Sequence, residues 1–244
     1  MNKKFVRKSL ILAGSNSDIG IEVVKILIAD NPWDIHLVGR TKPDLATLDN
    51  DKTNFYFYEC DFLDKSQTDS IIADIFQSNK PDLALIAVGS LPSENSELDL
   101  ESTRLTLETN AIAAIRLVQL VTASFLENKN GKLILFSSVA AERPRLKNFT
   151  YGASKKAADF YTFGLANRVK NLGVQIKILR LGYVYSKMSR NFPAAPFAIT
   201  KEVAAQKIVS SLNSKRIIQY IPGRLRVVFC VLRFLPWTIF SRLE

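Results

Sequence analysis

Short apolar runs and segments of helical periodicity alternate along the whole chain. The apolar runs predict buried strands at 10–13, 35–38, 55–59, 83–88, 132–136 and 175–179. The periodic segments predict helices at about 20–30, 66–78, 101–127, 152–171 and 201–212. Strands that alternate with helices are typical of an α/β fold, here a Rossmann-like, doubly wound parallel sheet flanked by helices on both faces.

The length of 244 residues suits a single domain of this kind, which we place at residues 1–222. Residues 223–244 follow as a C-terminal amphipathic extension that mixes apolar side chains with arginines. No stretch reaches the roughly 20 uninterrupted apolar residues of a membrane-spanning helix. The apolar run at 9–14 is too short for the core of a signal peptide and leads into a glycine loop, so it is expected to be the first strand.

The amino-acid composition limits which cofactors and partners can be expected. Cys60 and Cys230 lie far apart and predict no disulfide, which fits a reducing cytoplasm, and a single histidine leaves too little for a metal site. The net charge is +10, but no basic run with interleaved aromatic residues indicates nucleic-acid binding, and no nucleic-acid partner is expected. Several cations gather near the C-terminus instead, where an anionic membrane surface or a phosphate-bearing substrate would explain them.

A glycine loop follows the first predicted strand and opens the first predicted helix. Gly14 permits a tight turn, Gly20 lets the helix pack against the strand, and the helix N-terminus offers N–H groups to a pyrophosphate. The predicted contacts of this loop with a dinucleotide are Gly14, Asn16, Ser17, Asp18, Ile19 and Gly20. A plain strand-to-helix turn is the alternative.

Arg40 follows the second predicted strand, where an acidic residue would bind the ribose 2′-hydroxyl of NAD(H). A guanidinium there, with Lys42 nearby, favours the 2′-phosphate of NADP(H), and NAD(H) stays open as the alternative. Asp61, after the third strand, either accepts a hydrogen bond from the adenine amino group or caps the helix that follows.

The strongest chemical pattern combines Ser138, after a buried strand, with Tyr151 and Lys155. Four residues separate the tyrosine from the lysine, so a helix projects both side chains from one face. A phenol with a pKa of about 10 is a poor acid or base at neutral pH, and a neighbouring ammonium is expected to lower that pKa. Ser138 can hold a substrate carbonyl against the tyrosine. A surface Tyr–Lys pair is the alternative reading of the spacing.

With these residues in order, the sequence resembles the short-chain dehydrogenase/reductase family over nearly its whole length. The resemblance implies that Tyr151 is the general acid in carbonyl reduction, that Lys155 binds the nicotinamide ribose, and that Asn110 supports a water in a proton relay. It further implies cofactor contacts at Val88, Gly89, Tyr151, Lys155, Gly182, Val184 and Ser186. Departures from the family pattern are Asp18 in place of a glycine, the segment 87–90, and Leu181 in place of a proline.

Segments 140–145, 148–152 and 232–240 resemble a narrower group, the decaprenylphosphoryl keto-pentose reductases. This resemblance implies reduction of the 2-keto sugar of a polyprenyl phosphate for cell-wall arabinan, with a partner oxidase that supplies the keto sugar. The group is described as using NADH, whereas Arg40 favours NADPH. A reductase of another lipid or small ketone is the alternative substrate class, and a non-catalytic dinucleotide-binding regulator is the alternative function class.

The apolar and basic tail fits an interfacial anchor that contacts the membrane peripherally, so we expect a cytoplasmic protein at the inner face of the membrane. A lid over the active site and a homo-oligomer interface are the alternatives. Arg143, Arg145 and Lys147 lie between Ser138 and Tyr151 and predict either a phosphate contact or a solvated basic loop.

Overall fold

The computed structural model describes residues 7–48, 50–92, 98–145 and 147–241. The main sheet has seven parallel strands in the order β3-β2-β1-β4-β5-β6-β9. Its strands are β1 (Lys8–Ala13), β2 (Trp33–Gly39), β3 (Asn54–Glu59), β4 (Leu83–Ile86), β5 (Gly131–Ser138), β6 (Val174–Leu181) and β9 (Ile218–Ile221). A two-stranded sheet joins β7 (Val184–Tyr185) to β8 (Ile199–Thr200).

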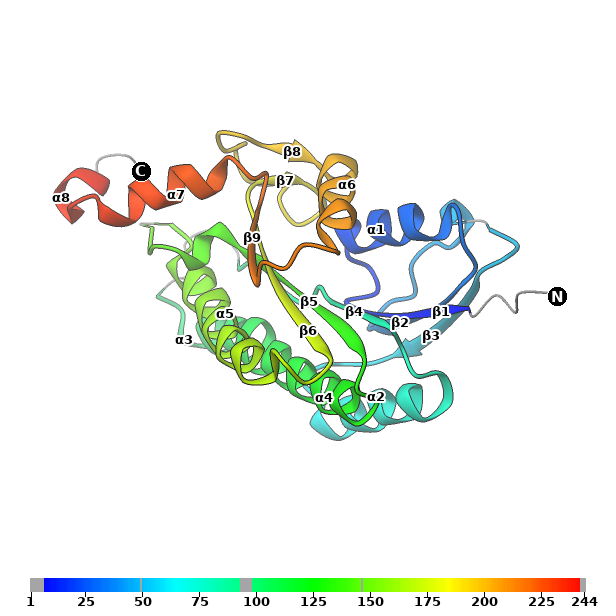
Figure 1. Cartoon of the computed structure of the whole chain (residues 1–244). Helices are drawn as coiled ribbons and strands as arrows, with labels where there is room; N and C mark the ends of the chain where they lie inside the picture. The colour runs from blue at the N-terminus through cyan, green and yellow to red at the C-terminus, as the bar shows by residue number, and fades with distance from the viewer. Residues whose placement is uncertain (1–6, 49, 93–97, 146, 242–244) are drawn as a thin grey trace.

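Helices cover both faces of this sheet, which confirms the predicted fold class (Figure 1). The described helices are α1 (Asp18–Ile28), α2 (Lys65–Asn79), α3 (Leu100–Leu107), α4 (Ala114–Glu127), α5 (Phe149–Val169), α6 (Lys201–Ser211), α7 (Leu225–Phe234) and α8 (Trp237–Phe240). A π-helical segment, Glu108–Ala113, joins α3 to α4, and a 3-10 turn, Val139–Ala141, follows β5.

Side chains that alternate along the buried strands form two hydrophobic cores, one on each face of the sheet. Leu10 and Leu12 of β1 pack in the cluster that also contains residues of α1 and α6, whereas Ile11 and Ala13 pack in the cluster with α2, α4 and α5. Successive side chains of a strand point to opposite faces, so a strand covered on both sides is apolar throughout. This is why the five central strands, β2, β1, β4, β5 and β6, were visible in the sequence.

The seventh strand, β9, was missed by the sequence analysis. It pairs only with β6 and forms one edge of the sheet, and three of its four residues are partly exposed. A short edge strand of this kind shows neither a fully apolar run nor a clean alternation. Within the described residues, the segment Leu100–Glu127 is long and apolar enough to cross a membrane, but half of its most apolar window is buried. Its buried side chains, such as Leu117 and Val121, belong to the core.

Candidate active site

The glycine loop after β1 is fixed by its backbone. Gly14 has a φ of +98°, and a Cβ there would lie 2.8 Å from the carbonyl oxygen of Ala87. The N–H groups of Gly14 and Ser15 both donate to the carbonyl of Val38, at 2.9 and 3.0 Å. Ser17 caps α1 by accepting a hydrogen bond from the Gly20 N–H. The loop therefore leads directly into a helix N-terminus, the arrangement that binds phosphate groups.

Asp18 is turned away from this loop. Its carboxylate accepts a hydrogen bond of 2.6 Å from the Lys187 N–H and lies 3.6 Å from the Lys187 ammonium. This lysine belongs to the segment after β7, so the contact ties the start of α1 to that segment. The negative charge that departs from the family pattern is thus compensated within the chain. Asn16 is exposed and Ile19 is partly buried in the same loop region.

The end of β2 lies against the glycine loop. Ser15 Oγ donates to the carbonyl of Thr41, and a Cβ on Gly39 would lie 2.4 Å from Ser15 Oγ. Arg40 lies between Gly39 and Thr41 in the sequence, and its side chain is exposed. Within the described residues its guanidinium has no carboxylate partner. The residues therefore fit a dinucleotide with a phosphate on its adenosine ribose, which places an anion beside Arg40.

Asp61 does not cap the helix that follows it, and this alternative from the sequence was wrong. Asp64 is the N-cap of α2, since its side chain accepts a hydrogen bond from the Gln67 N–H. Asp61 instead accepts from the Leu63 N–H at 3.1 Å in a tight turn. Its carboxylate is exposed, so the predicted contact with adenine is sterically open.

The structure brings Ser138 and Tyr151 together. Ser138 ends β5 and its Oγ accepts a hydrogen bond from the Ala140 N–H, while Tyr151 lies in the first turn of α5. Gly152 lets the two segments approach, because a Cβ there would lie 2.8 Å from the carbonyl of Ala140. Burial raises the pKa of Tyr151 to about 12, although a hydrogen bond with the Ser138 side chain works against this. The phenol is therefore protonated at neutral pH.

Lys155 lies one turn further along α5, with its amine 5.9 Å from the ring centre of Tyr151. The amine donates to the carbonyls of Val88 and Phe136, at 3.1 and 3.3 Å, and Gly89 leaves the space for it. Burial lowers the pKa of Lys155 to about 8, although Asp159 raises it. The expectation of a lowered pKa for Tyr151 was wrong for the chain by itself, because burial dominates and raises that pKa.

Asn110 lies in the π-helical segment and holds the loop after β4. Its Oδ1 accepts from the Ser90 N–H at 2.7 Å, and its Nδ2 donates to the Ser90 carbonyl and to Ser154 Oγ. Ser154 Oγ in turn donates to the carbonyl of Tyr151. Asn110 thus connects the loop that contains Val88 and Gly89 to the catalytic helix, and its predicted role in a proton relay stays a prediction.

A second polar cluster, which the sequence analysis missed, lies beside these residues. Arg180 at the end of β6 donates to Asp159 at 2.7 Å and forms an ion pair with Glu142. Glu142 also accepts hydrogen bonds from Tyr220 of β9 and from Arg233 of α7. Burial would lower the pKa of Arg180, but the two carboxylates outweigh burial and raise it. The cluster joins five chain segments around one buried guanidinium.

The last predicted contacts lie beyond β6. Val184 is buried in β7, and the N–H of Ser186 donates to Ser189 Oγ. Gly182 packs against the tail, since a Cβ there would lie 2.4 Å from a methyl group of Leu225. Its N–H donates to the carbonyl of Ile221 at the end of β9, and its predicted contact with the cofactor stays a prediction.

Arg143 contacts the tail and does not lie in a solvated loop, and its predicted phosphate contact stays a prediction. Its guanidinium donates to the Leu232 carbonyl and lies 4.1 Å from the ring centre of Phe240. Arg145 and Lys147 are exposed, as expected for a solvated loop. The segment between Ser138 and Tyr151 is therefore held against α7 and α8.

Comparison with known proteins identifies the family. A sequence model described as short chain dehydrogenase matches residues 8–196. An uncharacterized oxidoreductase of Mycobacterium tuberculosis is 33% identical over 162 residues, 66% of this chain, and the match spans just under two thirds of that relative, 65%. An uncharacterized oxidoreductase of Streptomyces coelicolor is 28% identical over 97% of this chain and 96% of its own.

A solved short chain dehydrogenase from Burkholderia cenocepacia, in complex with NADP, has the same fold. It superposes with a TM-score of 0.81 at 17% identity, over 97% of each chain. A match to the family over most of the residues, together with this fold, is consistent with the order of motifs along the chain. The chain belongs to the short-chain dehydrogenase family.

Proposed function

We propose that the chain is an NADP(H)-dependent carbonyl reductase. The observation that carries the proposal is the trio of Ser138, Tyr151 and Lys155: a protonated phenol in hydrogen-bond contact with a serine hydroxyl, next to a buried lysine amine that no carboxylate of the described residues contacts directly. When bound, the dinucleotide supplies the hydride that reduces the carbonyl carbon. The chain's own residues must then hold the carbonyl oxygen and provide its proton.

Tyr151 is the proton donor in this proposal. Its pKa of about 12 keeps the proton on the phenol until a carbonyl oxygen begins to gain negative charge, when transfer becomes favourable. Ser138 holds that oxygen through its hydroxyl. Lys155, with a pKa of about 8, is largely protonated at neutral pH and can favour the phenolate that remains after transfer.

The preference for NADP(H) rests on Arg40 beside the glycine loop. The guanidinium is exposed and unpaired within the described residues, and the similar Burkholderia structure is a complex with NADP. A guanidinium binds a phosphate through two parallel hydrogen bonds, which a ribose hydroxyl does not reproduce. NAD(H) is the alternative cofactor, and comparing the rates of NADPH and NADH oxidation decides between the two.

The proposed substrate is the 2-keto sugar of a polyprenyl phosphate, and a partner oxidase would supply it. Besides the sequence resemblance, the support is the tail. On α7, Val227, Val231 and Phe234 are 69%, 60% and 80% exposed, and they lie opposite the buried face formed by Leu225 and Phe229. An apolar stripe that faces outward suits peripheral contact with a membrane, where a lipid-linked sugar resides.

The test is oxidation of NADPH and of NADH, followed in parallel with a synthetic prenylphosphoryl keto-pentose and with a water-soluble diketone. The proposal expects turnover of the keto-pentose and a preference for NADPH. Turnover of the diketone alone would assign the chain to another ketone class, and cofactor binding with no turnover of any ketone would make it a dinucleotide-binding regulator.

Membrane contact has its own test, sedimentation with phospholipid vesicles. The double variant Val231→Ser/Phe234→Ser should lose binding, because about 25 cal/mol is forfeited per Å² of apolar surface that no longer enters the bilayer. Val203→Ser, on the partly exposed face of α6, is the matched control and should bind as the unmodified chain does. Equal binding of all three proteins would contradict the proposed contact.

A further inference from the structure

Two grooves flank the edge strand β9, and both are lined by cations. The smaller has a volume of about 230 Å³ and the larger about 1080 Å³, and they share Arg216, Ile218, Tyr220 and Arg226. The cations along them are Lys170, Arg180, Lys207, Lys215, Arg216, Arg226 and Arg233. No aspartate or glutamate is among the described residues that line either groove. The residues that line these grooves therefore include positively charged side chains and no negatively charged ones.

Among the described residues, carboxylates neutralise two of these cations. Arg180 and Arg233 pair with the carboxylates of the polar cluster around Glu142. The other five are exposed, and in the described part of the chain their side chains form no ion pair or hydrogen bond: Lys170, Lys207, Lys215, Arg216 and Arg226. Like charges held together repel one another unless an anion lies between them.

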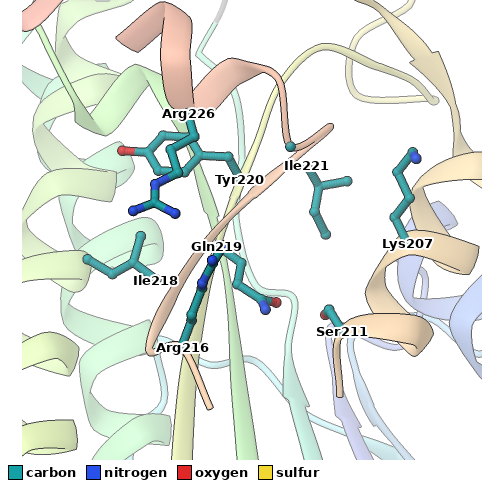
Figure 2. Close-up of a pocket in the computed structure, with 9 residues that line it drawn as sticks. Lys207, Ser211, Arg216, Ile218, Gln219, Tyr220, Ile221 and Arg226 are labelled. Carbon is teal, nitrogen blue, oxygen red and sulfur yellow. The ribbon is translucent and has the colours of Figure 1, made fainter. Parts of the chain in front are cut away.

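Arg216 precedes β9 and Arg226 lies on α7, which follows β9, and both line the two grooves. Figure 2 shows their guanidinium groups pointing toward one another beside Ile218 and Gln219, with Lys207 and Ser211 on the facing wall. Two guanidinium groups that converge in this way can bind the oxygens of one phosphate.

The groove adjoins the apolar stripe of the tail. On α7, Arg226 and Arg233 lie about two turns apart on one face, and the exposed Val227 and Phe234 follow them by one position each, on the neighbouring face. In Figure 1 this helix extends away from the sheet beyond β9. A ligand that touches both faces must carry phosphate next to hydrocarbon, which is the chemistry of a phospholipid at the bilayer surface.

We propose that the groove along β9, with Arg216 and Arg226 as its clamp, binds the phosphate of anionic phospholipid headgroups while the stripe of α7 enters the bilayer. This inference rests on the proposed membrane contact and adds a polar site that selects the membrane by its charge. Each cation near an anionic membrane surface contributes about 1 kcal/mol, so two contribute about a 30-fold change in affinity.

The test compares vesicles of phosphatidylcholine with vesicles that also contain phosphatidylglycerol. The full chain should bind the anionic vesicles more tightly, and Arg216→Gln/Arg226→Gln should weaken that binding about 30-fold while leaving binding to phosphatidylcholine unchanged. The control Lys52→Gln/Lys65→Gln removes two exposed cations at a distance from the groove, on the far side of the sheet near β3 and α2. Turnover of a water-soluble ketone should not change in either variant, which shows that both fold.

The outcomes separate the two claims. If the unmodified chain binds no vesicle, the membrane contact fails, and this inference fails with it. If it binds but both charge variants lose affinity equally, or neither loses any, the contact stands and the assignment of the groove is overturned. Competition by inorganic phosphate in the mM range without any vesicle preference would make the groove a site for free phosphate and would also overturn the assignment.

Discussion

Helix α5 contributes to two buried polar clusters that differ in how their charges are compensated. Tyr151 and Lys155 belong to the first, in which the lysine amine donates to two backbone carbonyls and pairs with no carboxylate of the described residues. Asp159, one turn further, belongs to the second, in which Arg180 is paired with two carboxylates. Burial dominates the pKa values in the first cluster, whereas ion pairing outweighs burial at Arg180 in the second. A buried cation without a carboxylate partner indicates a catalytic role. A buried cation that is paired with carboxylates indicates a role in stabilising the fold.

Among the variants that compare the two clusters, the largest expected effect concerns Lys155. Lys155→Met removes the amine that favours the phenolate of Tyr151, so kcat for ketone reduction should fall about 10³-fold. The neighbouring variant Lys156→Met is the control, because Lys156 is exposed on the outer face of α5 and should retain nearly full activity. Steady-state oxidation of NADPH measures both. Similar activities in the two variants would contradict a catalytic role for Lys155.

The second prediction addresses the compensated cluster. Arg180→Met leaves Glu142 and Asp159 buried without their common partner and should lower the free energy of unfolding by about 3 kcal/mol. Arg233→Gln, which removes an ion pair with an exposed arginine, should change it by less than about 1 kcal/mol. Urea denaturation compares the two. A stable Arg180→Met protein would mean that this cluster is not a scaffold.

The third prediction uses pH. The pKa of Lys155 is lowered from 10.5 to about 8 in the folded chain, so the proton is bound more tightly in the unfolded state. Lys155 therefore disfavours folding below pH 8, and this effect fades as the pH rises toward 10.5. The stability of the unmodified chain relative to Lys155→Met should rise by up to about 2 kcal/mol between pH 8 and pH 10. A flat difference across this range would mean that Lys155 is not desolvated.

The smallest expected effect concerns the cofactor. Arg40→Asp replaces the unpaired guanidinium with a carboxylate, so the ratio of kcat/KM for NADPH to that for NADH should fall at least about tenfold, equivalent to 1.4 kcal/mol. Lys52→Asp makes the same change of charge at an exposed position further along the chain and should leave the ratio unchanged. An unchanged ratio in Arg40→Asp would remove the argument for NADP(H).

The features that could be predicted from the sequence are those that depend on residues close together in the chain. Central strands such as β1 and β5 are apolar because both faces are covered, and the spacing of Tyr151 and Lys155 places both side chains on one face of α5. The cap of α2 was misjudged because Asp61 and Asp64 both precede the helix, and only the position of the Gln67 N–H distinguishes them.

Features that join distant segments stayed hidden. The cluster around Arg180 needs Glu142, Asp159 and Tyr220 from three other elements, and no spacing in the sequence relates them. The raised pKa of Tyr151 was equally hidden, because it depends on how deeply α5 is buried rather than on the residue four positions away.

The central claim is that the phenol of Tyr151 gives its proton to a carbonyl oxygen. The most direct measurement is the single-turnover reduction of a water-soluble ketone by NADPH in Tyr151→Phe, with NADPH affinity measured on the same protein. The account predicts affinity within about twofold of the unmodified chain and a rate lower by about 10³-fold or more. Reduction at the unmodified rate by the Phe variant would contradict it.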